Sequence, residues 1–126
     1  MVPTDLRYTN DHEWIRVEGD RATIGITAHA ADHLGDIVFV ELPEVGRVID
    51  QSAPFGVVES VKAVSDLLAP VSGTVVENNG ALNGEPELVN GDPYGAGWMI
   101  RIAIGQPSQL DELLDPAAYD ALIAEG

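Results

Sequence analysis

The one lysine of the chain, Lys62, lies in the segment GVVESVKAVSD, residues 56–66, between valine-rich runs. The rest of the six lysines and arginines are all arginine, although 21 residues are acidic. Arginine supplies positive charge, but only lysine offers a primary amine that can be acylated or can form an imine. The pattern therefore indicates chemistry at the Lys62 amine. The alternative is a surface lysine without a special role.

The residues around Lys62 predict a β-hairpin. PFGVVES, residues 54–60, and LLAPVSGTVVEN, residues 67–78, have the composition of strands, and SVKAVSD lies between them. A chain reversal near VKA would place Lys62 at the hairpin tip, in water, where a modifying enzyme can reach its amine. An imine-forming lysine needs a desolvated pocket that lowers its pKa. The hairpin therefore favours a carrier of an attached group over an enzyme.

Short strand-like runs alternate with turn residues along much of the chain. EWIRVEG, residues 13–19, has a period of two, which predicts a half-buried strand with Ile15 and Trp14 on opposite faces. RATIGIT, residues 21–27, repeats the pattern after a predicted hairpin turn, whereas the continuous apolar run DIVFVEL, residues 36–42, predicts a more buried strand. Further strands are predicted in GRVI, FGVVES, SGTVVEN and GWMIRIAI. The set is typical of a mainly β fold, a β-sandwich or flattened barrel.

Helices are predicted in few places. TAHAADHLG begins with Thr27 as N-cap and ends at Gly35 as the C′ residue. SQLDELLD opens on Ser108 with an acid three residues later, which resembles a capping box and predicts a helix with its leucines on one face. DPAAYDALIAEG has Asp115 as N-cap and Pro116 in the first helical position.

A long segment rich in Gly, Pro and Asn, residues 78–97, precedes the last predicted strand. Structureless loops of this length inside a compact domain are usually functional. The alternative is a surface insertion with a short helical turn at EPELV.

Length, composition and charge limit the class of protein. A chain of 126 residues with 45% hydrophobic content predicts a single globular domain, residues 1–126, with 107–126 as a C-terminal helical segment packed on it. Its formal net charge of −15 repels phosphate backbones and anionic lipids, which argues against nucleic-acid and membrane partners. The absence of cysteine excludes disulfides and thiolate metal sites.

The N-terminal sequence predicts where the protein works. MVPTDLRYTN has neither the charged and apolar regions of a signal peptide nor the arginine-rich, acid-poor composition of a transit peptide. We therefore expect a cytoplasmic protein, or a protein of the mitochondrial matrix if a presequence has been removed.

Beyond these patterns, three segments resemble the H protein family of the glycine cleavage system. VESVKAVSDLLAPVSGTVVENN resembles the lipoyl-attachment segment, YTNDHEWIRVEGDRATIGITAHAADHLGDIVFVELPEVG the N-terminal half, and LVNGDPYGAGWMIRI the C-terminal signature. The resemblance spans residues 5–120, and the motifs keep the order of the family. It implies a lipoyl/biotinyl-carrier-like β-sandwich of two antiparallel sheets with short C-terminal helices.

The resemblance implies that Lys62 carries lipoic acid in amide linkage. The other residues of the modification motif are Glu59, Ser60, Val61, Ala63 and Asp66. The arm would take an aminomethyl group from glycine decarboxylase, a pyridoxal-phosphate enzyme, and present it to an aminomethyltransferase. Dihydrolipoamide dehydrogenase would reoxidise the dithiol, and a lipoate ligase or octanoyltransferase would attach the arm. The protein would be a non-catalytic carrier; the alternative is a relay that hands lipoyl or octanoyl groups to other carriers.

The resemblance also implies a cleft that shields the loaded arm from water. Its polar residues would be Glu13 of HEW, His33 of DHLG and Asp66 of VKAVSD, with a carboxylate paired to the charged amino group of the cargo. Asp11 lies where the family pattern has serine or another small polar residue, so its place in the cleft is open. A further carboxylate there could help to neutralise the amine.

Other carriers and enzymes fit the residues less well. A biotinyl carrier has methionines beside its lysine, whereas Val61 and Ala63 flank Lys62. The lipoyl domains of 2-oxoacid dehydrogenases are shorter and lack the PYGAGWM region. An enzyme that forms an imine at Lys62 would need an acid–base cluster or a phosphate-binding loop, for which the sequence gives no sign.

An alternative use of the two histidines in residues 27–35 is a metal site. His29 and His33 lie four residues apart, with Asp32 and Asp36 nearby, which is a spacing that metal sites use. The pattern lacks the HExxH context, so no metal ligands are predicted.

Overall fold

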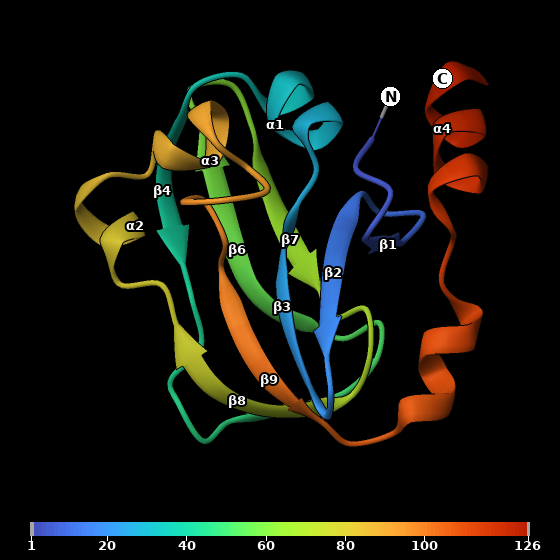
Figure 1. Ribbon diagram of the computed structural model, residues 1–126. Helices are drawn as coiled ribbons and strands as arrows, with labels where there is room; N and C mark the ends of the chain where they lie inside the picture. Colours follow the sequence, from blue (N-terminus) through green and yellow to red (C-terminus); the bar gives the residue numbers. More distant parts are fainter. Residues whose placement is uncertain (1, 126) are drawn as a thin grey trace.

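Two antiparallel sheets form the body of the computed structural model, which describes residues 2–125 (Figure 1). The larger sheet has six strands, in the spatial order β1 (Arg7–Tyr8), β2 (Glu13–Glu18), β3 (Arg21–Ile26), β9 (Ile100–Ile104), β8 (Gly73–Asn78) and β5 (Val48–Ile49). The smaller sheet has three, β4 (Ile37–Glu41), β6 (Pro54–Ser60) and β7 (Val64–Leu68). The two ends of the predicted domain, Met1 and Gly126, lie outside the described residues.

Short helices surround the sheets. They are α1 (Ala28–Leu34), α2 (Ala81–Gly84), α3 (Leu88–Gly91), the 3₁₀ helix η1 (Pro107–Glu112) and α4 (Pro116–Glu125). The last of them, α4, runs along one side of the molecule next to β1 (Figure 1). The predicted fold of two antiparallel sheets with short C-terminal helices is confirmed. No helix within residues 2–125 is long and apolar enough to cross a membrane.

The core lies between the two sheets. Because side chains alternate along a strand, every second residue of each sheet points inward. Ile24 and Ile102 of the larger sheet and Val58 and Leu67 of the smaller sheet belong to one buried apolar cluster. Removing side chains of this size from water stabilises the fold by about 1.5–3 kcal/mol each.

The strand β2 is buried on both faces near its start, which corrects the half-buried prediction. Ile15 points into the main core, and Trp14 is fully buried in a second cluster on the opposite face. That face is covered by Tyr8 and by Tyr119 of α4, whose rings stack with centroids 4.5 Å apart. Gly25 makes room for the indole, since a Cβ there would lie 2.8 Å from it.

The prediction that residues 36–42 form a more buried strand is wrong for β4. Val38 and Phe39 are exposed, while Ile37 and Val40 point into the core. The register with β6 shifts between Ile37 and Phe39, and this bulge turns two successive side chains to the outside. A continuous apolar run is therefore half exposed here, on the outer face of the smaller sheet.

The helix-capping predictions were confirmed at α1 and α4. The Thr27 side chain accepts a hydrogen bond from the Ala30 amide, and Gly35, with φ of 78°, caps α1 directly after its last residue. The Asp115 carboxylate accepts a hydrogen bond of 2.8 Å from the Ala118 amide at the start of α4.

The capping box predicted at Ser108 is wrong. Residues 107–112 form the 3₁₀ helix η1, whose N-cap makes no side-chain hydrogen bond. The leucines predicted on one helical face are Leu110, Leu113 and Leu114, and the last two follow the helix. The physical reason is the bridge between Leu114 and Tyr8, whose amides and carbonyls pair at 2.8 and 2.9 Å and pull the chain into extended form.

Candidate functional site

The turn that carries Lys62 joins β6 to β7. The two strands pair up to Glu59 and Val64, and the Ser60 amide donates to the Ala63 carbonyl at 2.8 Å. The Ser60 hydroxyl accepts hydrogen bonds from the amides of Lys62 and Ala63 at 3.3 and 3.1 Å. This serine therefore shapes the turn, and Lys62 is exposed at its tip, as the sequence predicted.

The end of α1 supports the turn from one side. The Val61 amide donates to the Asp36 carbonyl at 3.0 Å. A Cβ placed on Gly35 would lie 3.6 Å from the Lys62 Cε, so the far end of the lysine side chain, next to its amine, passes close to this glycine. An exposed lysine with this support fits an acceptor for a modifying group better than an imine-forming base, which needs a desolvated pocket.

Asn90 of α3 stabilises the segment that supports the turn, a role that no sequence pattern predicted. Its side-chain oxygen accepts from the Ile37 amide at 2.9 Å, and its side-chain nitrogen donates to the Gly35 carbonyl at 2.8 Å. Asn90 thus holds the segment between α1 and β4, on which the Lys62 turn rests. The predicted loop of residues 78–97 contains the two short helices α2 and α3, and α3 gives it this positioning role.

A cavity of about 180 Å³ lies beside the β6–β7 hairpin. Its lining includes all three residues predicted for the cleft, Glu13, His33 and Asp66, although they come from β2, α1 and β7. Asp66 and His33 are exposed, whereas Glu13 is buried. The apolar part of the wall consists of Ile26, Ala30, Leu34, Val58 and Leu67.

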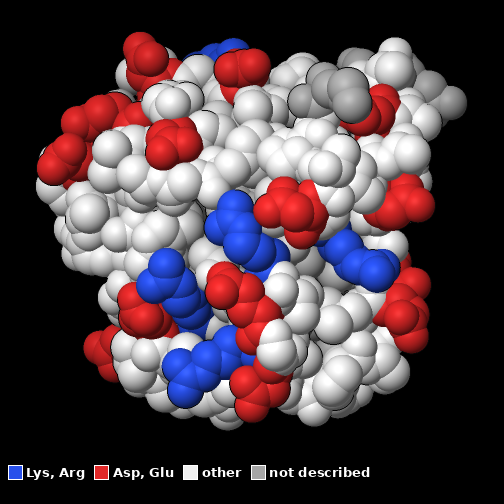
Figure 2. Space-filling view, in the orientation of Figure 1, with Lys and Arg blue, Asp and Glu red and all other residues white. Residues whose placement is uncertain are grey.

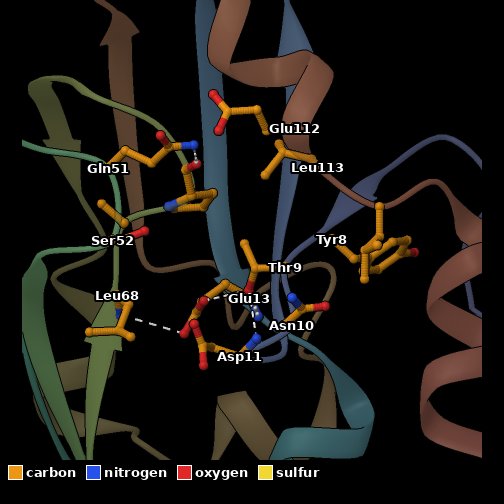
Figure 3. A pocket seen from close by; sticks show the side chains of 13 residues that line it. Tyr8, Thr9, Asn10, Asp11, Glu13, Gln51, Ser52, Leu68, Glu112 and Leu113 are labelled. Carbon is orange, nitrogen blue, oxygen red and sulfur yellow. Dashed lines mark hydrogen bonds between the residues drawn. The ribbon is translucent and has the colours of Figure 1, made fainter.

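Glu13 is a buried carboxylate, only 3% exposed. The Thr9 hydroxyl donates to its Oε1 at 2.6 Å, and the Leu68 amide donates to its Oε2 at 3.4 Å (Figure 3). Burial raises the pKa of Glu13 to about 7, while the hydrogen bonds from Thr9 and Leu68 lower it and the nearby Asp11 raises it further. Glu13 can therefore change its charge near neutral pH.

A second cavity, of about 220 Å³, lies against the other side of the loop that precedes β2 (Figure 3). Asp11 and Glu13 line both cavities, and Gln51, Ser52 and Glu112 border this second one. Asp11, whose place in the cleft the sequence left open, is thus a neighbour of Glu13 in the same cavity wall.

Three histidines lie in a row beside the first cavity. The ring centroids of His12 and His29 are 4.8 Å apart, and those of His29 and His33 are 4.3 Å apart. Burial and the neighbouring His29 lower the pKa of His12, whose Nδ1 lies 2.8 Å from the Tyr119 hydroxyl. Among residues 2–125 no group of three histidine or acidic side chains has a geometry that could hold a metal ion.

Known proteins resemble this chain along almost its whole length. The family model of the glycine cleavage H-protein matches residues 6–126. The chain is 60% identical over 125 residues to the glycine cleavage system H protein of Symbiobacterium thermophilum, covering 99% of this chain and 98% of that protein. It is 58% identical over 119 residues to the H protein of Phenylobacterium zucineum, covering 94% and 98%.

A solved structure shows the same fold. The crystal structure of a glycine cleavage system H protein from Mycobacterium marinum matches with a TM-score of 0.87 at 42% identity, over 98% of this chain and 99% of that one. Sequence and fold therefore lead to one conclusion: the chain belongs to the glycine cleavage H-protein family.

Proposed function

We propose that Lys62 carries lipoic acid in amide linkage and that the chain is the lipoyl-bearing carrier of the glycine cleavage system. The observation that carries the proposal is the place of Lys62, an exposed primary amine at a hairpin tip beside a partly apolar cavity. Membership of the H-protein family supports lipoate as the acyl group. In this proposal the whole chain acts as one carrier domain and leaves the catalysis to its partners.

The cavity fits such a group. Its apolar wall suits a hydrocarbon arm, and its polar residues suit a charged end. Ser65 of the cavity lies three residues from Lys62, so at most roughly 10 Å of chain separates the two. An arm anchored at Lys62 can therefore fold back and place its end in the cavity.

When attached, the lipoyl group would supply a disulfide that can take up and release an aminomethyl group, with reoxidation of the resulting dithiol. The chain's own task is to hold the charged amino group of this cargo. Ionised Glu13 supplies a negative charge that burial makes more effective, and Asp11 and Asp66 add to the field. An amine that stays protonated has no free lone pair with which to expel a neighbouring sulfur, so this pairing would slow loss of the cargo to water.

The partners in this proposal are glycine decarboxylase, the aminomethyltransferase and dihydrolipoamide dehydrogenase. The net charge of −15 supports docking to basic faces on these enzymes. Figure 2 shows acidic side chains spread over the visible face, with most of the basic ones at its centre and in its lower half. Complementary charge would raise the rates of association with each partner and make them depend on salt.

A lipoate ligase or octanoyltransferase would attach the arm. Such an enzyme must bring its activated carbonyl to the Lys62 amine, so its surface must cover the hairpin tip. Val61 and Val64 on the hairpin and Val38 and Phe39 on the neighbouring β4 are exposed there. Glu59 lies between Phe39 and Val64 across the smaller sheet, which supports an apolar contact with a basic rim on the attaching enzyme.

Intact mass tests the proposal. The chain is co-expressed with a lipoate ligase and supplied with lipoate, beside a Lys62→Arg control. The expected result is a gain of one lipoyl amide in the chain and none in the control, followed by loading with glycine and glycine decarboxylase. A chain that gains no mass while the ligase modifies a known acceptor would show that Lys62 is not the attachment site.

A further inference from the structure

The loop before β2 is bonded to itself through one hydroxyl group. Thr9 Oγ1 accepts hydrogen bonds from the amides of Asp11 at 3.2 Å and Glu13 at 3.1 Å. The same oxygen lies 2.6 Å from the Glu13 Oε1. Figure 3 shows this hydroxyl directed at the Glu13 carboxylate.

These contacts fix the direction of the hydroxyl proton. A threonine hydroxyl has one hydrogen to donate and two lone pairs that accept. Since two amides occupy the lone pairs of Thr9, its hydrogen must point at Glu13. A donor that is held in this way favours the ionised carboxylate over the carboxylic acid.

The backbone keeps the loop in this shape. His12 has a φ of 70°, a left-handed conformation that is uncommon for a residue with a side chain. Its amide donates to the Thr9 carbonyl at 3.2 Å, and its ring contacts the Tyr119 hydroxyl at 2.8 Å. Surrounding contacts therefore hold a strained turn that brings Thr9 and Glu13 together.

Other charges act on the same carboxylate from several elements. Burial and Asp11 oppose its ionisation, so the Thr9 hydrogen bond works against both. The remaining titratable side chains on the walls of the two cavities are Tyr8, His12, His33, Asp66 and Glu112. The balance of these effects decides whether the Glu13 carboxyl group is charged or neutral when a cation occupies the cavity beside Lys62.

We propose that Thr9 is a positioning residue for Glu13: its hydroxyl orients the carboxylate in the cavity wall and favours its ionised form, which the positive charge of the cargo requires. This inference rests on the proposed function, because the cargo enters only with the lipoyl arm. It adds a residue that does not itself line the arm cavity but acts through one that does.

The test uses Thr9→Val, which removes the hydroxyl, and Thr9→Ser, which keeps it. Carbon-13 NMR of the full chain without the arm follows the titration of Glu13, with Glu13→Gln to assign its signal. The pKa of Glu13 is expected to rise in Thr9→Val and to stay at the wild-type value in Thr9→Ser. An increase of about 1 in the pKa of Glu13 would lower the ionised fraction of this carboxyl group at pH 7 about fivefold. Thr9→Ala supplies the same loss should Thr9→Val not fold.

The second readout is ammonia release from the loaded carrier as a function of pH. The pH at the midpoint of ammonia release is expected to rise with the pKa of Glu13 in Thr9→Val. In Thr9→Ser it is expected to equal the wild-type value. An unchanged Glu13 titration in both Thr9→Val and Thr9→Ala would overturn the proposal. If ammonia release depends on pH in the same way in the wild type, Thr9→Val and Glu13→Gln, then Thr9 and Glu13 do not protect the cargo and that part of the proposal is overturned. Failure of Lys62 to accept lipoate would instead reject the proposed function, while the titration still decides what Thr9 does to Glu13.

Discussion

The hairpin that carries Lys62 and the loop that carries Glu13 border the same cavity but are held in different ways. At the hairpin tip, hydrogen bonds fix the backbone and leave the lysine side chain exposed. In the loop, the Glu13 side chain itself is buried, and both of its oxygens accept hydrogen bonds. A residue that an enzyme must modify needs access, whereas a residue that must hold a charge needs a fixed position.

The largest expected effect lies on the loop side, in the pH dependence of stability. The pKa of Glu13 is about 7 in the folded chain against 4.5 ordinarily, so folding favours its protonated form. Its contribution is therefore fully present below about pH 4.5 and is lost as the pH rises through about 7. Relative to Glu13→Gln, the wild type should lose about 3 kcal/mol of unfolding free energy between pH 4 and pH 9.

Denaturant unfolding of both proteins at several pH values measures this difference. The comparison of wild type with Glu13→Gln cancels the titrations that the two proteins share. Parallel stability curves would mean that the Glu13 carboxylate is not protonated more readily in the folded chain, and the contrast between the two regions would weaken.

A smaller effect is expected where α3 supports the hairpin. Asn90→Ala leaves the Ile37 amide and the Gly35 carbonyl without their partner, which should cost about 2 kcal/mol of stability. Thermal unfolding measures the loss, and Asn83→Ala, at an exposed position in α2, is the matched control. Equal stability of the two variants would show that the turn under Lys62 does not depend on Asn90.

The exposed side chains of the hairpin should matter for attachment and little for folding. The double variant Val61→Ser/Val64→Ser should slow lipoate attachment about fivefold, equivalent to about 1 kcal/mol of contact with the ligase. Val45→Ser/Val48→Ser is the control, because these valines are 61% and 70% exposed, against 70% and 67% for Val61 and Val64. Mass spectrometry over time gives the rate of lipoate attachment in both double variants. Equal slowing in the two would mean that the ligase does not contact Val61 and Val64 specifically.

The smallest effect is expected at Lys62 itself. Since its side chain is exposed, Lys62→Arg should change the unfolding free energy by less than about 0.5 kcal/mol. Denaturant unfolding checks this, on the same Lys62→Arg variant that serves as the control for lipoate attachment. A large loss of stability would mean that Lys62 is a structural residue and would remove the contrast with Glu13.

The sequence predicted the local features of this fold well. Period-two alternation located β2 and β3, and the caps at Thr27 and Asp115 were confirmed. The turn at Lys62 was also found, because short turns depend on neighbouring residues.

Features that depend on distant parts of the chain were predicted poorly. Trp14 is buried because Pro93 and Tyr94, far along the chain, lie against its indole and Tyr119 of α4 belongs to the same cluster, and no local pattern carries that information. Phe39 is exposed because a bulge turns it outward, although its segment looks like a core strand. Asn90 and Thr9 act through bonds to residues on other elements or on a strained turn, so their polar side chains resemble those of ordinary loops.

The isolation of Lys62 in the sequence also makes it an unusually clean reporter. Isotope labelling of lysine alone would place one spectroscopic probe in the whole protein, at the base of the arm. Its terminal nitrogen would change from an ammonium to an amide on attachment, and no second lysine would overlap with it. In the purified protein the proposed attachment site could therefore be followed through one signal, whether unmodified, modified or bound to a partner.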